Sequence, residues 1–111
     1  MGDVVYICDT CAAPGEAPEG AGFAADLRMA APVEVEVRTT SCLNMCDAPL
    51  ALALRGSGKV AYLFSGVRPA EDVADTLALL KLYRDAPDGV IQDARPAGRL
   101  RFCLQGRVPP L

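Results

Sequence analysis

Polar and hydrophobic residues alternate most regularly over residues 33–38, where three valines are separated by charged side chains. This period of two predicts a strand with its valines on the core and its charges in water. A run of β-branched and aromatic residues at 4–7 predicts an earlier, buried strand. Between the two, apolar residues at helical spacing predict a short helix over residues 20–30.

Two further apolar runs, residues 50–54 and 60–64, flank a stretch that contains two glycines, which predicts an antiparallel hairpin. Residues 69–83 follow, with a proline and acidic residues at the start and apolar residues at helical spacing, which predicts the main helix. Because a crossover helix joins the first two strands, we expect them to be parallel. The order strand, helix, strand, cysteine loop, hairpin, helix predicts an α/β protein with a reduced thioredoxin-like fold.

Beyond this point, prolines and glycines recur too often for a long regular element. We therefore expect residues 1–84 to form a thioredoxin-like cluster-binding domain. Residues 85–111 are expected to be an irregular, basic tail that packs partly on this domain. The alternation of Leu100, Phe102 and Leu104 would allow one short strand within the tail.

The chain has 111 residues, 51% of them hydrophobic, and a net charge of −3, which suits one domain with a single core. The negative balance argues against nucleic acid as the main partner. Residues 1–83 hold eleven acidic and six basic side chains, whereas residues 84–111 hold three and five. The acidic body favours a partner protein with a basic docking surface.

The N-terminus has no basic region before an apolar segment, and no run approaches 18 apolar residues. We therefore expect a cytoplasmic protein with no membrane partner. In a reducing cytoplasm, paired cysteines are more often metal ligands or redox-active groups than structural disulfides.

Four of the five cysteines form two close pairs, each after an apolar run. They are Cys8 with Cys11, and Cys42 with Cys46. Four thiolates make a complete ligand set for a metal, and without histidine they are the only soft ligands available. The parallel topology is expected to bring both pairs to one rim of the sheet. Cys103 lies between Phe102 and Leu104 and is expected to be a packing residue outside the site.

The second half of the chain resembles the thioredoxin-like two-iron two-sulfur (2Fe-2S) ferredoxins. These proteins carry Cys-Leu-Gly-x-Cys, then a proline, a hairpin with glycine, and a helix that opens with Thr-Pro-Glu-Asp. The matching segments here are Cys42-Leu43-Asn44-Met45-Cys46-Asp47-Ala48-Pro49, the turn at Gly56 to Gly58, and Arg68-Pro69-Ala70-Glu71-Asp72. The resemblance extends to a branch of small bacterial predicted metal-binding proteins, whose genes often lie beside cobalamin-biosynthesis and cobalt-insertion genes.

This resemblance implies a 2Fe-2S cluster with Cys8, Cys11, Cys42 and Cys46 as ligands. The first two cysteines are closer together here than in the better-known ferredoxins. Asn44 stands where the family has glycine, and asparagine also tolerates a left-handed backbone conformation.

The implied function is that of a one-electron carrier or redox module, not an enzyme on its own, linked to cobalamin or cobalt metabolism. Its partner would be a redox protein or a metal-insertion protein, and whether the chain forms a homodimer stays open. Two alternatives remain. One is a structural zinc domain that mediates protein interactions. The other is a thiol-disulfide oxidoreductase that uses Cys8 and Cys11, although this leaves the second pair unexplained.

Overall fold

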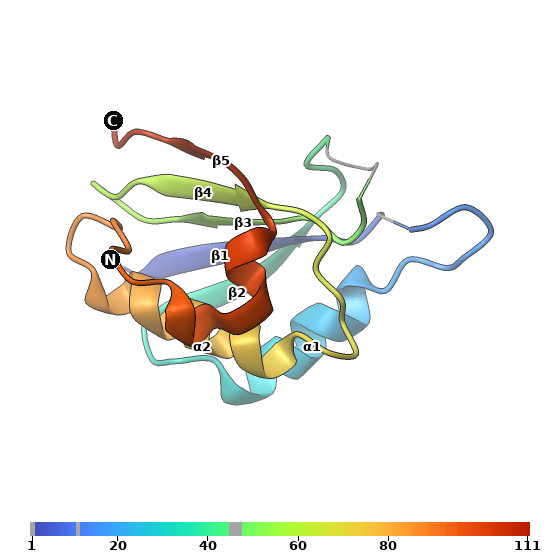
Figure 1. The fold of residues 1–111 in the computed structure, drawn as a ribbon. Helices are drawn as coiled ribbons and strands as arrows, with labels where there is room; N and C mark the ends of the chain where they lie inside the picture. Colours follow the sequence, from blue (N-terminus) through green and yellow to red (C-terminus); the bar gives the residue numbers. More distant parts are fainter. Residues whose placement is uncertain (1, 11, 45–47) are drawn as a thin grey trace.

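The computed structural model describes residues 2–10, 12–44 and 48–111 and shows a mixed five-stranded sheet (Figure 1). The strand order is β2-β1-β3-β4-β5, with β1 parallel to β2 and every other neighbouring pair antiparallel. The strands are β1 (Asp3–Cys8), β2 (Val35–Thr40), β3 (Leu52–Arg55), β4 (Ala61–Phe64) and β5 (Leu104–Val108).

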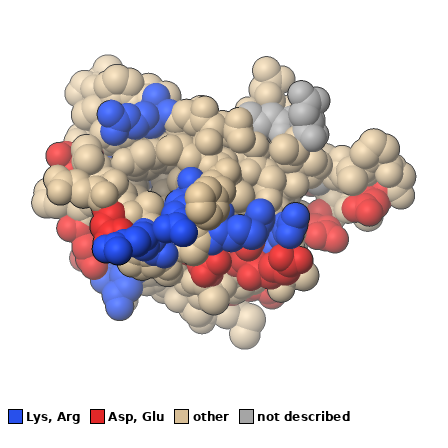
Figure 2. Space-filling view, viewed as in Figure 1, with Lys and Arg blue, Asp and Glu red and all other residues tan. Residues whose placement is uncertain are grey.

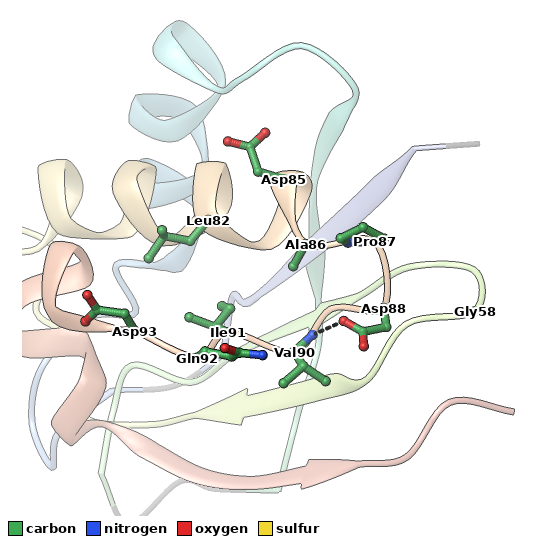
Figure 3. A pocket seen from close by; sticks show the side chains of 10 residues that line it. All are labelled: Gly58, Leu82, Asp85, Ala86, Pro87, Asp88, Val90, Ile91, Gln92 and Asp93. Atoms are coloured by element: carbon green, nitrogen blue, oxygen red, sulfur yellow. Dashed lines mark hydrogen bonds between the residues drawn. The ribbon is translucent and has the colours of Figure 1, made fainter.

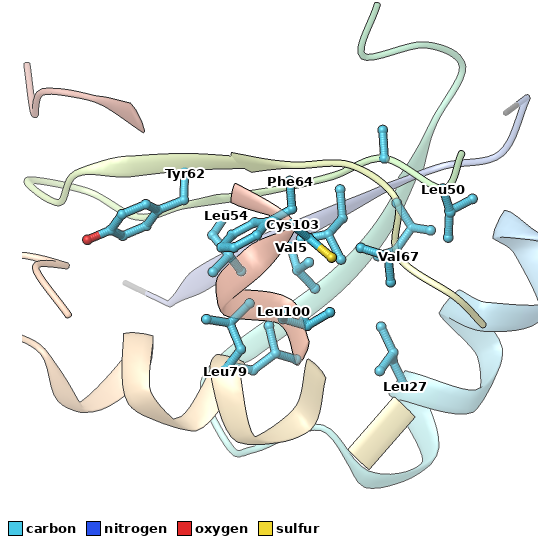
Figure 4. Close-up of a cluster of buried hydrophobic side chains, with 14 of the residues drawn as sticks. Val5, Leu27, Leu50, Leu54, Tyr62, Phe64, Val67, Leu79, Leu100 and Cys103 are labelled. Carbon is cyan, nitrogen blue, oxygen red and sulfur yellow. The ribbon is translucent and has the colours of Figure 1, made fainter. Parts of the chain in front are cut away.

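Helices α1 (Gly20–Ala30) and α2 (Val73–Asp85) lie on the same side of the sheet, and the 3-10 helix η1 (Arg95–Phe102) packs against α2 (Figure 1). The core forms where this layer meets the sheet (Figure 4). It contains side chains from both layers, among them Val5, Leu27, Leu54, Phe64, Leu79 and Leu100. None of the helices in the described residues is long and apolar enough to cross a membrane.

The local patterns predicted most of the central elements. The helix expected over residues 20–30 is α1, and its buried side chains include Phe23 and Leu27, one turn apart. The expected hairpin is formed by β3 and β4. The parallel pairing of the first two strands is also confirmed, with Val5 opposite Val37 in the register. The mixed α/β class is therefore correct.

Strand β2 and helix α2 begin later in the sequence than predicted. β2 begins at Val35, because Glu34 has a φ of 74° and breaks the extended backbone, which leaves Val33 78% exposed. The main helix begins at Val73 and not near residue 69. The preceding residues form a turn in which the Arg68 backbone N–H donates to the Asp72 carboxylate at 2.7 Å.

The C-terminal segment is more regular than its composition indicates. Residues 85–111 were expected to be an irregular tail, yet they supply η1 and a fifth strand, which pairs with β4 through Ala61 opposite Val108. The short strand predicted from the alternation of Leu100, Phe102 and Leu104 was wrong in position. Leu100 and Phe102 lie in η1, and only Leu104 lies in β5. The segment forms a strand because its backbone pairs with the otherwise open edge of β4.

An ion pair between Arg99 and the buried carboxylate of Asp72 fixes η1 on the start of α2. The Asp72 side chain is buried, and Arg99 Nε donates to its Oδ1 at 3.1 Å. Burial alone raises the pKa of Asp72, but the hydrogen bonds from Arg99 and from the Arg68 amide outweigh it, so the pKa lies below its usual range. Acidic and basic side chains adjoin on this face of the molecule (Figure 2).

We predict that Asp72→Asn lowers the free energy of unfolding by about 2–4 kcal/mol at pH 7, because it leaves the Arg99 guanidinium without its charged partner. A lowered native pKa means that the carboxylate stabilises the fold above about pH 3.9, the usual pKa of aspartate in an unfolded chain. That contribution is lost as the pH falls through the native pKa. Urea unfolding at pH 7 and below pH 4 should therefore show the gap between variant and parent narrowing in acid.

The matched control is Asp93→Asn, which breaks an exposed pair with Arg95. Its urea midpoint should stay close to that of the parent. Equal midpoint shifts in the two variants would contradict a special role for the buried pair.

Candidate metal centre

The first two strands end side by side at one rim of the sheet. Cys8, the last residue of β1, is the register partner of Thr40, the last residue of β2. The backbone continues in contact beyond both strands, since Asp9 N–H donates to Thr40 O at 2.9 Å. Cys8 therefore ends β1, and Cys42 comes two residues after the end of the neighbouring parallel strand β2.

Cys8 is buried against the segment that leads to Cys42. Its exposed fraction is 0%, and its Sγ lies 3.7 Å from the carbonyl oxygen of Ser41. The Thr10 hydroxyl donates to the same carbonyl oxygen and lies 3.5 Å from Cys8 Sγ. The first loop is thus held directly on the residue before Cys42.

Cys42 lies at the surface in a tight turn. The Asn44 backbone N–H donates to Cys42 Sγ at 3.2 Å, and Asn44 has a φ of 60°. The left-handed conformation that makes asparagine a suitable substitute for glycine is therefore observed. Hydrogen bonds from backbone amides to ligand sulfurs are one of the features that tune iron-sulfur centres.

The other two expected ligands, Cys11 and Cys46, lie outside the described residues. Within residues 2–10, 12–44 and 48–111, no three Cys, Asp or Glu side chains gather as a group that could hold a metal ion. The donor chemistry of the described half still fits a soft metal or an iron-sulfur cluster, because it provides a thiol from each of two adjoining strand ends and an amide donor to one sulfur.

Cys103 is a packing residue, as expected. It is 4% exposed within the core (Figure 4), and its Sγ lies 3.8 Å from Gly66 O and 3.7 Å from Arg99 O. Burial raises the pKa of its thiol, and this disfavours the thiolate that a metal needs.

Sequence analysis missed Gly20, the first residue of α1. A Cβ at this position would come within 2.8 Å of Asp9 Cα and closer still to the Cys8 carbonyl oxygen. The N-terminus of α1 can therefore contact the backbone at Cys8 only because residue 20 is glycine. The available signal was a glycine at the start of an otherwise helical pattern, just after Pro18 and Glu19.

Two of the hollows that the described residues line bear on the site. The larger has a volume of about 670 Å³ and lies beside Gly58 and the loop after α2, at the end of the sheet where β1 begins (Figure 3). It is remote from the cysteine rim, and its lining includes Asp85, Asp88 and Asp93. The smaller, about 260 Å³, lies next to the segments that follow the two cysteine pairs.

Fold and site together define a small α/β domain with cysteines at the carboxyl ends of two parallel strands. A family model described as a protein of unknown function, DUF1636, matches residues 5–110. The chain belongs to this family. The comparisons with curated proteins and with solved structures found no match to the chain.

We predict that Gly20→Ala lowers the free energy of unfolding by about 1–3 kcal/mol, because the added methyl group must displace the backbone at Cys8 and Asp9. Gly22→Ala is the matched control in the same helix, since a Cβ there meets nothing within 4 Å. That variant should gain about 0.5–1 kcal/mol from helix propensity. Urea unfolding of both proteins measures the difference, and a Gly20→Ala protein as stable as Gly22→Ala would refute the close approach.

Proposed function

We propose that this protein is a small iron-sulfur protein that holds a 2Fe-2S cluster on Cys8, Cys11, Cys42 and Cys46. The observation that carries the proposal is the position of Cys8 and Cys42 at the carboxyl ends of neighbouring parallel strands, with the Asn44 amide directed at the Cys42 sulfur. When bound, such a cluster supplies one-electron chemistry. The protein would act as an electron carrier or redox module and not as an enzyme on its own.

The sheet supports a thioredoxin-like assignment for this domain. Strands β2, β1, β3 and β4 are adjacent in that order, and β3 is antiparallel to both of its neighbours. The strand-helix-strand unit followed by a hairpin and a helix is the arrangement that the ferredoxin resemblance implies.

The residues at the rim have distinct roles in this proposal. The Asn44 amide would supply a hydrogen bond to the Cys42 sulfur, while burial of Cys8 keeps water from one side of the site. Cys42 lies at the surface, so a partner would approach from its side. We infer a cytoplasmic partner with a basic docking surface, either a redox protein or a metal-insertion protein of cobalamin or cobalt metabolism.

A structural zinc domain is the main alternative, because four thiolates also suit a closed zinc site. A thiol-disulfide oxidoreductase is less well supported. Its reactive cysteine takes a lowered pKa from a helix that begins at the motif, whereas α1 begins only at Gly20, beyond a loop.

We predict that protein purified without oxygen contains about two iron and two acid-labile sulfide per chain. Cys42→Ser should lose most of the iron, because it removes a thiolate ligand. Cys103→Ala is the control and should keep the full metal content and visible spectrum, since Cys103 is a packing residue. Colourless protein with one zinc per chain would establish the zinc alternative, and cluster loss in Cys103→Ala would mean that a different set of four cysteines binds the metal.

A redox titration separates a carrier from a structural centre. We expect reversible uptake of one electron per chain within the range of iron-sulfur centres, about −700 to +450 mV. The loss of visible absorbance on reduction measures this uptake. Zinc has no redox chemistry and would show no change with reductant. A cluster that accepts no electron anywhere in this range would exclude the carrier function.

A further inference from the structure

The smaller surface hollow is a groove lined by three segments of the chain. Residues 12–19, after the first pair, form one wall, and residues 67–71, between β4 and α2, form the other. Pro49 and Leu50, after the second pair, close the groove between them. Leu50 and Val67 are buried and Pro49 is half-buried, so the floor of the groove is apolar.

The rim of this groove is acidic. Glu16, Glu19 and Glu71 are exposed on it, with Arg68 as the one basic side chain. Arg68 contacts Glu71 at 3.3 Å, but both side chains are about 60% exposed, so this pair contributes little and a cation from outside can replace it. Acidic side chains are visible on the projecting loop between β1 and α1 (Figure 2).

Backbone hydrogen bonds hold the floor and the walls in place. Leu50 and Val67 exchange N–H to O bonds of 3.0 and 3.1 Å, and Gly66 N–H donates to Ala48 O at 2.6 Å. Within the other wall, Glu16 N–H donates to Ala13 O at 2.9 Å and closes a local turn. A groove fixed in this way loses little entropy when a partner binds.

We propose that this groove is the docking site for a partner protein segment that presents one apolar side chain flanked by lysine or arginine. The volume of about 260 Å³ is below the roughly 300–1,000 Å³ typical of small-molecule sites. This volume suits a single apolar side chain of a partner protein. Three carboxylates against one guanidinium at the rim favour a partner with basic residues on either side of that side chain. That the docked partner exchanges electrons with the protein rests on the proposed function, whereas the docking of a basic segment in the groove does not.

The test uses the peptide Lys-Arg-Leu-Arg-Lys-amide with fluorescein on its N-terminus, titrated with the full chain and followed by fluorescence anisotropy at low salt. The groove variant carries Glu16→Gln, Glu19→Gln and Glu71→Gln. The control carries Asp85→Asn, Asp88→Asn and Asp93→Asn, which remove the same charge at the remote hollow. We expect the groove variant to weaken binding about tenfold or more and the control less than about twofold. Binding should also weaken as salt rises.

A peptide with serine in place of leucine tests the apolar floor and should bind more weakly. If the two triple variants lost the same affinity for the peptide, binding would depend on net charge alone, and the proposal would be overturned. No binding at millimolar protein, or equal binding of the serine peptide, would overturn it as well.

Metal content measured on the same samples separates this proposal from the proposed function. Zinc-loaded protein that binds the peptide at the groove would refute the electron carrier and keep the docking site. Iron-sulfur protein that does not bind the peptide would refute the docking site alone.

Discussion

The buried contact between Asp72 and Arg99 connects three parts of the chain that lie far apart in sequence. Arg99 reaches from η1 to the residue before α2, and its Nη2 also donates to Gly66 O at 2.7 Å. Gly66 in turn donates its N–H to Ala48 O, just after the second cysteine pair. Since a buried carboxylate is costly without its partner, the C-terminal segment, the start of α2 and the end of the cysteine loop depend on one another.

A second polar cluster fixes the opposite end of the sheet. Lys59 Nζ, in the hairpin turn, donates to Asp3 at 2.9 Å and to Tyr83 O at 2.8 Å, while the Tyr83 hydroxyl donates to Val60 O at 2.6 Å. Burial raises the pKa of Tyr83, so the phenol stays protonated as a donor. The start of β1 is therefore anchored through polar groups and its middle through the apolar core. At the cysteine end of the strand, the close approach of Gly20 sets the position of α1.

Local apolar spacing was sufficient to predict α1 and the first two strands, the glycines between two apolar runs predicted the hairpin, and the crossover through α1 predicted the parallel pair. None of these patterns predicted β5 and η1, which depend on distant partners: the edge of β4 and the carboxylate of Asp72. By sequence, Asp72 is one of the acidic residues expected at the start of the main helix, yet its main partner is Arg99, 27 residues away. For the site, the pattern correctly located Cys8 and Cys42 at strand ends. The role of Gly20 was not predictable, because it depends on a backbone contact between separate elements.

The two cysteines at the rim differ in a way that bears on the proposed chemistry. Cys8 has no exposed surface, whereas Cys42 is exposed and receives an amide hydrogen bond. The potential of an iron-sulfur centre depends on the hydrogen bonds to its sulfurs and on its exposure to solvent. Substitutions at Asn44 would act through the first of these factors and substitutions around Cys8 through the second. An electron exchanged with a partner would then pass on the Cys42 side, since the other side is closed by the sheet and by α1.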